Sequence, residues 1–254
     1  MHVTERAAAG GVQSVERAFD LLELITDAGG KVTLSELAQA AGLPMPTIHR
    51  LLRTLMPKGY VRQLVNRQYA LGPRLIRLGE GASKQLGALA HAPLSSVVDR
   101  LGETSNMAVL DANMVLYVAQ VPSKHSMRMF TEVGARVHTH NSGVGKAILA
   151  QLDDDVVRTI VSLAGMPTPT EKSIGNIEDL LADLHLIRQR GYSIDDGEQE
   201  LGVRCLAMAV PLAPTPTAIS VSGPAARLDD AFTERAVPLL RQAAGIISAG
   251  LNQD

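Results

Sequence analysis

Residues 37–79 read LAQAAGLPMPTIHRLLRTLMPKGYVRQLVNRQYALGPRLIRLG and contain neither aspartate nor glutamate. The same stretch carries seven cationic residues, which are Arg50, Arg53, Lys58, Arg62, Arg67, Arg74 and Arg77. The whole chain of 254 residues is slightly acidic, with 24 basic and 26 acidic residues. A basic segment in such a chain is either a solvated face or the first sign of a nucleic-acid reader. The hydrophobic pattern beneath the charges bears on this choice.

Two helices are predicted at the start of the chain. Apolar residues at helical spacing predict a first helix with Ser14 as its N-cap, and Gly29-Gly30 ends it. Thr33 and Glu36 have the spacing of a capping box, which predicts the start of a second, short helix. Gly42 ends this helix.

The third predicted helix has an apolar face and a cationic face. Pro44 and Pro46 open it, because proline is tolerated in the first helical turn. The apolar stripe consists of Ile48, Leu51, Leu52 and Leu55. At 100° per residue, the opposite face carries Arg50 and Arg53, flanked by Thr47 and His49.

Two short strands, residues 60–64 and 67–71, are predicted around a Val65-Asn66 turn. Helices followed by such a hairpin form a winged helix-turn-helix, whose recognition helix enters the major groove of DNA. We expect Arg50 and Arg53 to contact guanine or phosphate, with Thr47 and His49 beside them. Arg62 and Arg67 on the wing would contact phosphate. The alternative is a helix-turn-helix that binds only protein.

Composition and charge limit the class of protein. Hydrophobic residues make up 46% of the chain, yet no apolar run approaches the ~20 residues of a membrane helix, and no signal-peptide core is present. We therefore expect a cytoplasmic protein with no membrane partner. Its single cysteine, Cys205, excludes an internal disulfide framework.

Charge divides unevenly along the sequence. Residues 11–84 hold ten basic against six acidic residues, a net charge of +4, whereas residues 85–254 hold thirteen against nineteen, a net charge of −6. A basic module joined to an acidic one indicates a nucleic-acid reader attached to a second function.

The second part of the chain reads as a mixed α/β sensor domain. A helix after Pro73 runs to about Ala90, and Pro93 begins another that ends at Gly102. Residues 107–110 and 115–119 predict a hairpin, and residues 127–130 a third strand. Further helices are predicted at residues 144–152, 154–163, 176–190 and 229–251, with strands at residues 203–210 and 218–221.

Several sequence motifs bear on whether the protein hydrolyses nucleotides, binds a metal or carries a nucleophilic serine. Gly143-Val144-Gly145-Lys146 lacks the distal glycine and the Ser/Thr of a phosphate loop, so nucleotide hydrolysis is not expected. His138 and His140 would share one face of a strand but have no evident third metal ligand. No Gly-x-Ser-x-Gly elbow is present. We therefore expect no metal, no cofactor and no catalytic residues.

Small polar groups are the remaining candidates for a ligand site. They are Asp195, Cys205, Ser220, Ser222 and the backbone amides around Gly143. Hydroxyls and N–H groups that converge in an apolar pocket suit a small carboxylate. By default, Cys205 is a buried and inert thiol.

The chain resembles the IclR family of bacterial transcription regulators. In the N-terminal part the resemblance rests on residues 12–18 (VQSVERA), 34–38 (LSELA), 49–52 (HRLL) and 69–72 (YALG). In the C-terminal part it rests on residues 102–104 (GET), 145–147 (GKA), 190–192 (RGY), 202–207 (GVRCLA) and 220–224 (SVSGP). These motifs occur in the family's order from about Val12 to Leu228.

The resemblance implies an α+β protein with an N-terminal winged helix-turn-helix joined by a linker helix to a GAF-like α/β effector-binding domain. The expected division is a leader at residues 1–11, the DNA-binding domain at 12–72, the linker helix at 73–91 and the effector domain at 92–254. It also implies dimers or tetramers on palindromic operator DNA.

In the family's sensors of small acids, the pocket positions match Met129, Gly143, Val144, Asp195, Val203, Cys205, Ser220 and Ser222. The ligands of that branch are small carboxylates such as glyoxylate and pyruvate, and other branches bind aromatic acids. The resemblance thus implies a regulator, and a repressor more than an activator. An enzyme that uses Cys205 or Asp195 is the alternative from another class.

The chain departs from the family pattern in three places. Met45 and Pro46 stand where a basic residue and serine are common, which removes a phosphate contact from the recognition helix. His138 replaces a usual proline. Residues 210–216 (VPLAPTP) replace a longer hairpin, a change at the rim of the expected pocket or at an oligomer surface.

Overall fold

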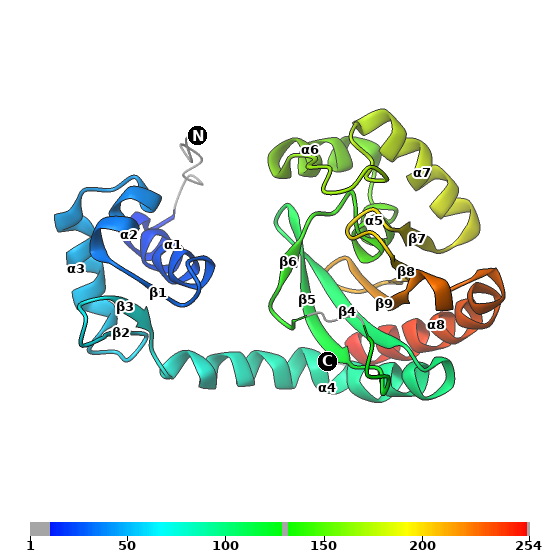
Figure 1. Cartoon of the computed structure of the whole chain (residues 1–254), viewed down its shortest axis with the longest axis horizontal. Helices are drawn as coiled ribbons and strands as arrows, with labels where there is room; N and C mark the ends of the chain where they lie inside the picture. Colours follow the sequence, from blue (N-terminus) through cyan, green and yellow to red (C-terminus); the bar gives the residue numbers. More distant parts are fainter. Residues whose placement is uncertain (1–10, 129–131, 253–254) are drawn as a thin grey trace. The chain divides into compact units, whose positions relative to one another are not determined.

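A computed structural model describes residues 11–128 and 132–252. The chain forms two compact units that divide between Ala82 and Ser83, and each has its own hydrophobic core (Figure 1). Among the described residues, no helix combines the length and the apolar character needed to cross a lipid bilayer. Met129, an expected effector residue, lies outside the described residues.

The first unit is a bundle of three helices against a small sheet. Its elements are α1 (Gln13–Asp27), β1 (Lys31–Val32), α2 (Leu34–Ala41), α3 (Met45–Leu55), β2 (Val61–Gln63) and β3 (Tyr69–Leu71). The sheet has the order β1-β3-β2, and both pairings are antiparallel. This is the predicted winged helix-turn-helix.

Local signals in the sequence explain the turn between α2 and α3. The Thr33 side chain accepts from the Glu36 amide while the Glu36 carboxylate accepts from the Thr33 amide, which confirms the capping box. Gly42 ends α2 in the left-handed conformation, with φ of 62°, which glycine adopts without steric cost. Helix α3 then buries Ile48 and Leu52 completely.

Three details of this unit differ from the prediction. Helix α1 begins earlier, with Val12 as its N-cap and no capping side chain, so Ser14 lies inside the helix. Strand β1 was not predicted, because two residues are too short to show an alternating pattern. Arg67 lies in the turn of the wing with φ of 65° and not on a strand.

The second unit is built on a six-stranded antiparallel sheet. Helix α4 (Arg74–Leu101) enters it from the first unit. The strands are β4 (Thr104–Asp111), β5 (Met114–Val121), β6 (Arg136–Val137), β7 (Ser193–Asp196), β8 (Val203–Val210) and β9 (Thr217–Pro224). The helices are α5 (Gly143–Leu149), α6 (Asp154–Ala164), α7 (Ile177–Arg190), the short 3-10 helix η1 (Ala225–Arg227) and α8 (Asp230–Leu251).

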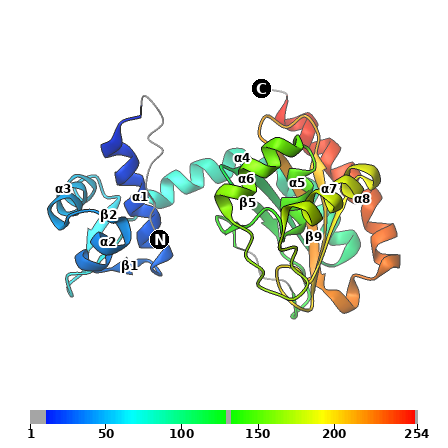
Figure 2. The same ribbon diagram turned by 90° about the horizontal axis from the view of Figure 1, so that it is seen from above.

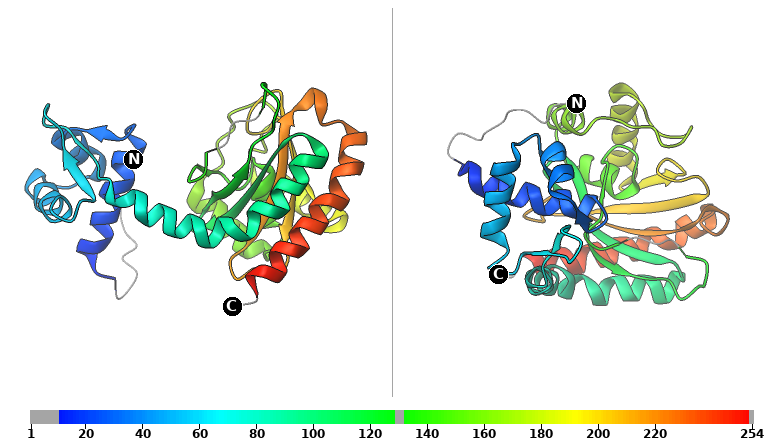
Figure 3. Two further views of the ribbon diagram at one scale, coloured as in Figure 1. Left: turned by 90° about the horizontal axis from the view of Figure 1, so that it is seen from below. Right: turned by 60° about the vertical axis from the view of Figure 1, so that its left-hand side comes forward.

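The sheet has the order β6-β5-β4-β9-β8-β7 and is covered on both faces. Helix α8 and the end of α4 pack side by side on one face, where Leu94, Leu240 and Ile219 share a core (Figures 2 and 3). Helix α5 lies on the other face with Val144 and Ile148 against Ala207. Helices α6 and α7 form an outer layer that packs with Leu149 of α5.

Four predictions for the second unit require correction. The helices predicted on either side of Pro93 are one helix, α4, so the expected boundary between residues 91 and 92 lies inside it. Of the strand predicted at residues 127–130, Met127 is an exposed bend and residues 129–130 lie outside the described residues; the second strand that pairs with β5 is β6. Strand β7 was not predicted. His138 and His140 precede α5 in a bend and not on a strand.

Candidate functional site

The exposed cations of the first unit gather on α3 and the wing. His49, Arg50 and Arg53 are exposed on α3, and Thr47 beside them is half-buried. Arg62 on β2 and Arg67 in the wing turn are also exposed. Burial of Ile48, Leu52 and Leu55 against the core forces the intervening positions of α3 outward.

The two units differ in whether their cations form ion pairs. Among the described residues, none of the seven cations of residues 37–79 forms an ion pair. In the second unit, by contrast, nine cations pair with carboxylates; they are Lys124, Arg136, Lys146, Arg158, Lys172, Arg188, Arg190, Arg204 and Arg227. These seven cations are therefore free to meet an external polyanion.

In the second unit, strand register places three predicted effector residues in one row. Asp195 on β7 lies opposite Cys205 on β8, which lies opposite Ser222 on β9. Neighbouring strands are about 4.8 Å apart, so the row spans about 10 Å. Ser220 lies two residues from Ser222 along β9 and therefore on the same face.

The first turn of α5 closes over this row. A Cβ atom on Gly143 would lie 2.8 Å from the sulfur of Cys205, so only glycine allows this approach. Val144 packs in the same cluster as Cys205. Val203 is half-buried at the start of β8, two residues before Cys205 and so on its face, but outside this cluster.

The thiol of Cys205 is a neutral group. It is buried, and the Ser222 hydroxyl donates to its sulfur at 3.3 Å. Burial raises the pKa of Cys205 to about 12, with the nearby Asp195 carboxyl adding to the effect. The thiol therefore stays protonated at neutral pH, which disfavours a role as a nucleophile.

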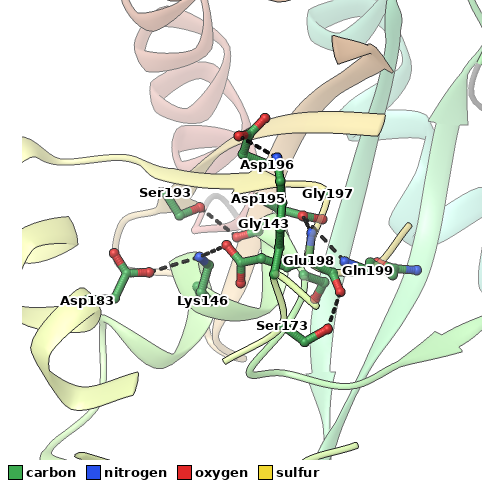
Figure 4. Close-up of polar contacts among 12 residues, drawn as sticks. Gly143, Lys146, Ser173, Asp183, Ser193, Asp195, Asp196, Gly197, Glu198 and Gln199 are labelled. Atoms are coloured by element: carbon green, nitrogen blue, oxygen red, sulfur yellow. Dashed lines mark hydrogen bonds and ion pairs between the residues drawn. The ribbon is translucent and has the colours of Figure 1, made fainter. Parts of the chain in front are cut away.

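Asp195 shapes the turn that follows β7 (Figure 4). Its Oδ1 atom accepts from the backbone N–H groups of Glu198 at 2.7 Å and Gln199 at 3.4 Å. Burial raises the pKa of Asp195 above its ordinary value, although these two hydrogen bonds and Lys146 act against the shift. Asp195 can thus serve both as a ligand group and as the anchor of its own turn.

Lys146 connects this turn to the helices. It is 2% exposed, and its Nζ atom lies 2.5 Å from Glu198 Oε1 and 2.8 Å from Asp183 Oδ2 of α7 (Figure 4). The lysine that resembles a phosphate-loop residue is therefore engaged inside the protein. Ser193 adds a second tie, because its hydroxyl donates to the Gly143 carbonyl at 2.6 Å.

Sequence reasoning missed two residues of this face. Asn106 on β4 is fully buried, accepts from Gln120 at 3.1 Å and donates to the Ser220 hydroxyl at 3.5 Å. Tyr117 on β5 packs in one cluster with Val144 and Cys205. A signal existed for Asn106, since residues 104–106 are polar at the start of an otherwise apolar strand.

The histidine pair lies beside α5 without the form of a metal centre. The His138 and His140 rings meet edge to face with centroids 5.5 Å apart, and Nε2 of His140 lies 2.9 Å from the Pro167 carbonyl oxygen. In the described parts of the chain, no group of three or more histidine, cysteine or acidic residues is arranged to hold a metal ion.

A separate groove of about 390 Å³ lies on the second unit. It is lined by Gly87, Ala88, His91, Leu94, Val118, Ala119, Gln120 and Val133. Since Leu94 and Val118 belong to the core under α4 and α8, this groove adjoins the face opposite α5. None of the predicted effector residues that the structure describes lines it.

Replacement of Glu198 by Gln tests the buried charge cluster. Glu198 and Asp183 are two carboxylates around Lys146, Arg190 lies 3.7 Å from Asp183, and Asp195 lies nearby. Burial raises the pKa of Glu198 from 4.5 to about 7. The folded protein therefore binds the proton of the Glu198 carboxyl more tightly than the unfolded chain does. The contribution of this pKa shift to the free energy of unfolding is full below pH 4.5 and is lost as pH rises to about 7.

We expect the free energy of unfolding of the wild type, relative to Glu198→Gln, to fall by roughly 2–3 kcal/mol across that window. Urea unfolding at pH 4.5 and pH 8 measures this difference. Glu178→Gln is the control, because Glu178 is exposed and paired with Arg158. Parallel pH profiles for the wild type and Glu198→Gln would contradict the expectation.

Comparison with known proteins agrees with this geometry. The description "Bacterial transcriptional regulator IclR C-terminal" matches residues 82–249, and "IclR helix-turn-helix domain" matches residues 14–64. The transcriptional repressor IclR of Escherichia coli is 40% identical over 95% of this chain and 91% of its own length. The acetate operon repressor of Salmonella typhimurium is 37% identical over 94% of this chain and 90% of its own length.

The fold agrees as well. An IclR transcriptional regulator from Alicyclobacillus acidocaldarius superposes with a TM-score of 0.84 at 28% identity, covering 94% of this chain and 98% of that chain. The fold predicted from the sequence, a helix-turn-helix domain with an α/β effector domain, is thereby confirmed. With both domains matched and a relative 40% identical along nearly the whole length, the chain belongs to the IclR family of bacterial transcriptional regulators, which bind DNA through their helix-turn-helix domain.

Proposed function

We propose that the chain is a repressor that binds operator DNA through α3 and the wing and is controlled by a small carboxylic acid bound beneath α5. The observation that carries the DNA half is the set of unpaired cations on the first unit. Cations that neutralise phosphates release counterions and so supply much of the affinity for DNA. The repressor role is supported by the names of the two curated relatives.

Arginines on α3 and arginines on the wing have different proposed roles, the first in reading bases and the second in binding phosphate. Arg50 and Arg53 are exposed on the helix that enters the groove in this class of fold. Arg62 and Arg67 extend from the hairpin, where contact with the phosphate backbone positions a protein without reading sequence. Met45 and Pro46 leave the first turn of α3 without a cation, so the wing has a larger share of phosphate binding.

Arg50→Ala and Arg53→Ala should each weaken binding to a palindromic operator by about 5- to 150-fold, which corresponds to ~1–3 kcal/mol for one lost arginine contact. Fluorescence anisotropy at a fixed salt concentration measures the affinity. The control is Lys124→Ala, an exposed cation of the second unit. Unchanged affinity in both arginine variants, with folding intact by circular dichroism, would refute the assignment of α3.

The effector half of the proposal rests on the row of neutral donors beneath α5. The hydroxyls of Ser220 and Ser222 and the protonated thiol of Cys205 lie near the glycine that starts α5. Lys146 is neutralised by Glu198 and Asp183, so dipoles and not a free cation would hold the anion. Such convergent donors in an apolar setting suit a small carboxylate.

Ser220→Ala and Ser222→Ala should each weaken the binding of glyoxylate or pyruvate by about 2- to 12-fold, since one hydrogen bond contributes ~0.5–1.5 kcal/mol. Isothermal titration calorimetry measures the affinity. Ser248→Ala on α8 is the matched control, because Ser248 is also buried but bonds to the Pro211 carbonyl. Absence of heat with every acid tested on the wild type would rule out the carboxylate while leaving the DNA assignment standing.

A second copy of the chain is the proposed partner of α1. Val12, Val15 and Phe19 are 63%, 50% and 63% exposed, and their spacing places them on one stripe of the helix. An exposed apolar stripe of this kind marks an interaction surface. Because helix-turn-helix proteins read palindromes as two-fold dimers, a second copy on this stripe fits the proposed function.

Phe19→Glu should shift the oligomer toward monomers, because a carboxylate cannot be buried cheaply against apolar partners. Light scattering coupled to size exclusion measures the mass. Gln39→Glu adds the same charge at an exposed position of α2 and should leave the mass unchanged. A Phe19→Glu variant with the mass of the wild type would exclude α1 as the contact surface.

A further inference from the structure

Tyr117 is a buried aromatic residue that faces the proposed effector site from β5. It lies opposite Ala108 of β4 and is 8% exposed. Its ring packs in one cluster with Val144 of α5 and with Cys205 of β8. On the face that carries α5, Tyr117 therefore approaches the proposed effector residues from β5, toward one edge of the sheet. Asp195 lies on β7, at the other edge.

The hydroxyl of Tyr117 has no hydrogen-bond partner among residues 11–128 and 132–252. Among the described residues, its oxygen is not one of the fully buried side-chain atoms that lack a partner, so the hydroxyl reaches space that water or a ligand atom can occupy. Burial, together with the nearby Cys205 and Asp195, raises the pKa of Tyr117 well above its ordinary value. The phenol is thus a protonated donor, and it is close to both of these residues.

Two neighbouring groups already have hydrogen-bond partners. Ser222 already donates to Cys205, and Asp195 Oδ1 already accepts two backbone N–H groups. A donor that the protein itself leaves unused at a candidate ligand site is available to a ligand atom that accepts. The carboxylate oxygens of a small acid, or another oxygen atom next to its carboxylate group, are such acceptors.

We propose that Tyr117 is a specificity-determining residue of the effector site, whose hydroxyl donates a hydrogen bond to an oxygen of the bound acid and whose ring limits the size of acid that fits. The inference rests on the proposed function, since it requires an acid beneath α5. It goes beyond it by naming a residue outside the predicted set and a selection for short acids over ring-bearing ones.

The ring limits size because of where it packs. Val144 and Cys205 contact the same cluster as the phenol, so a longer or wider ligand would have to displace a tightly packed aromatic side chain. A smaller side chain at position 117 would leave space that only a larger acid fills. Size selection and hydrogen bonding can therefore be separated by two substitutions.

Tyr117→Phe removes only the hydroxyl. The free protein should keep its melting temperature, because the deleted hydroxyl has no hydrogen bond to the described residues and is not fully buried. Affinity for glyoxylate or pyruvate should fall by about 2- to 12-fold on calorimetry, which matches one lost hydrogen bond of ~0.5–1.5 kcal/mol. A purely structural tyrosine would instead lose stability and keep its affinity.

Tyr117→Val removes the ring and keeps a residue that suits a strand. This variant should bind benzoate or 4-hydroxybenzoate more tightly than the wild type by 10-fold or more, and pyruvate more weakly. Tyr69→Phe is the matched control, because Tyr69 is equally buried but lies in the core of the first unit. It should change neither affinity.

The outcomes separate the two proposals. If the wild type binds none of these acids, the carboxylate effector fails and the role of Tyr117 fails with it. If the wild type binds a short acid and Tyr117→Phe binds it equally well, only the role of Tyr117 is overturned. If Tyr117→Val gains no affinity for ring-bearing acids, the size limit is overturned even where the hydrogen bond stands.

Discussion

The ammonium group of Lys146 lies inside the second unit, 2.5 Å from a Glu198 carboxylate oxygen and 2.8 Å from one of Asp183. Three elements meet at this nitrogen, which are α5, α7 and the turn after β7. Removing one member of such a buried group would leave the others uncompensated, which is strongly destabilising. The position of Gly143 over Cys205, and hence the depth of the proposed effector site, depends on α5 staying where this cluster holds it.

The two units differ in how their charged side chains are paired, and this difference fits different functions. The second unit pairs most of its cations internally, and the buried Glu103, just before β4, pairs with the half-buried Arg227 of η1. In the described part of the first unit, the seven cations of residues 37–79 are exposed and form no ion pair. A ligand that favours one arrangement of the DNA-binding domains would couple the two sites, and α4, which belongs to both units, is the covalent connection.

Much of the first unit was predictable because its signals are local. The capping box at Thr33, the left-handed Gly42 and the stripe on α3 each depend on residues within about two helical turns. Prediction failed where tertiary packing prevailed over a local preference. Proline usually begins a helix, but packing of α4 against α8 carries the helix through Pro93. Strands β1, β6 and β7 are too short to show a period.

The sequence by itself determined the family, the helices of the first unit and the identity of the exposed arginines, since these follow from motifs and short-range periodicity. Only the tertiary structure decided which residues meet beneath α5. Asp195, Cys205 and Ser222 are distant in the chain and become neighbours through strand register, and Tyr117 and Asn106 reach the same face from two other strands. Register is set by the hydrophobic patterns of both paired strands together with turn geometry, so a short motif in one strand does not reveal its partner.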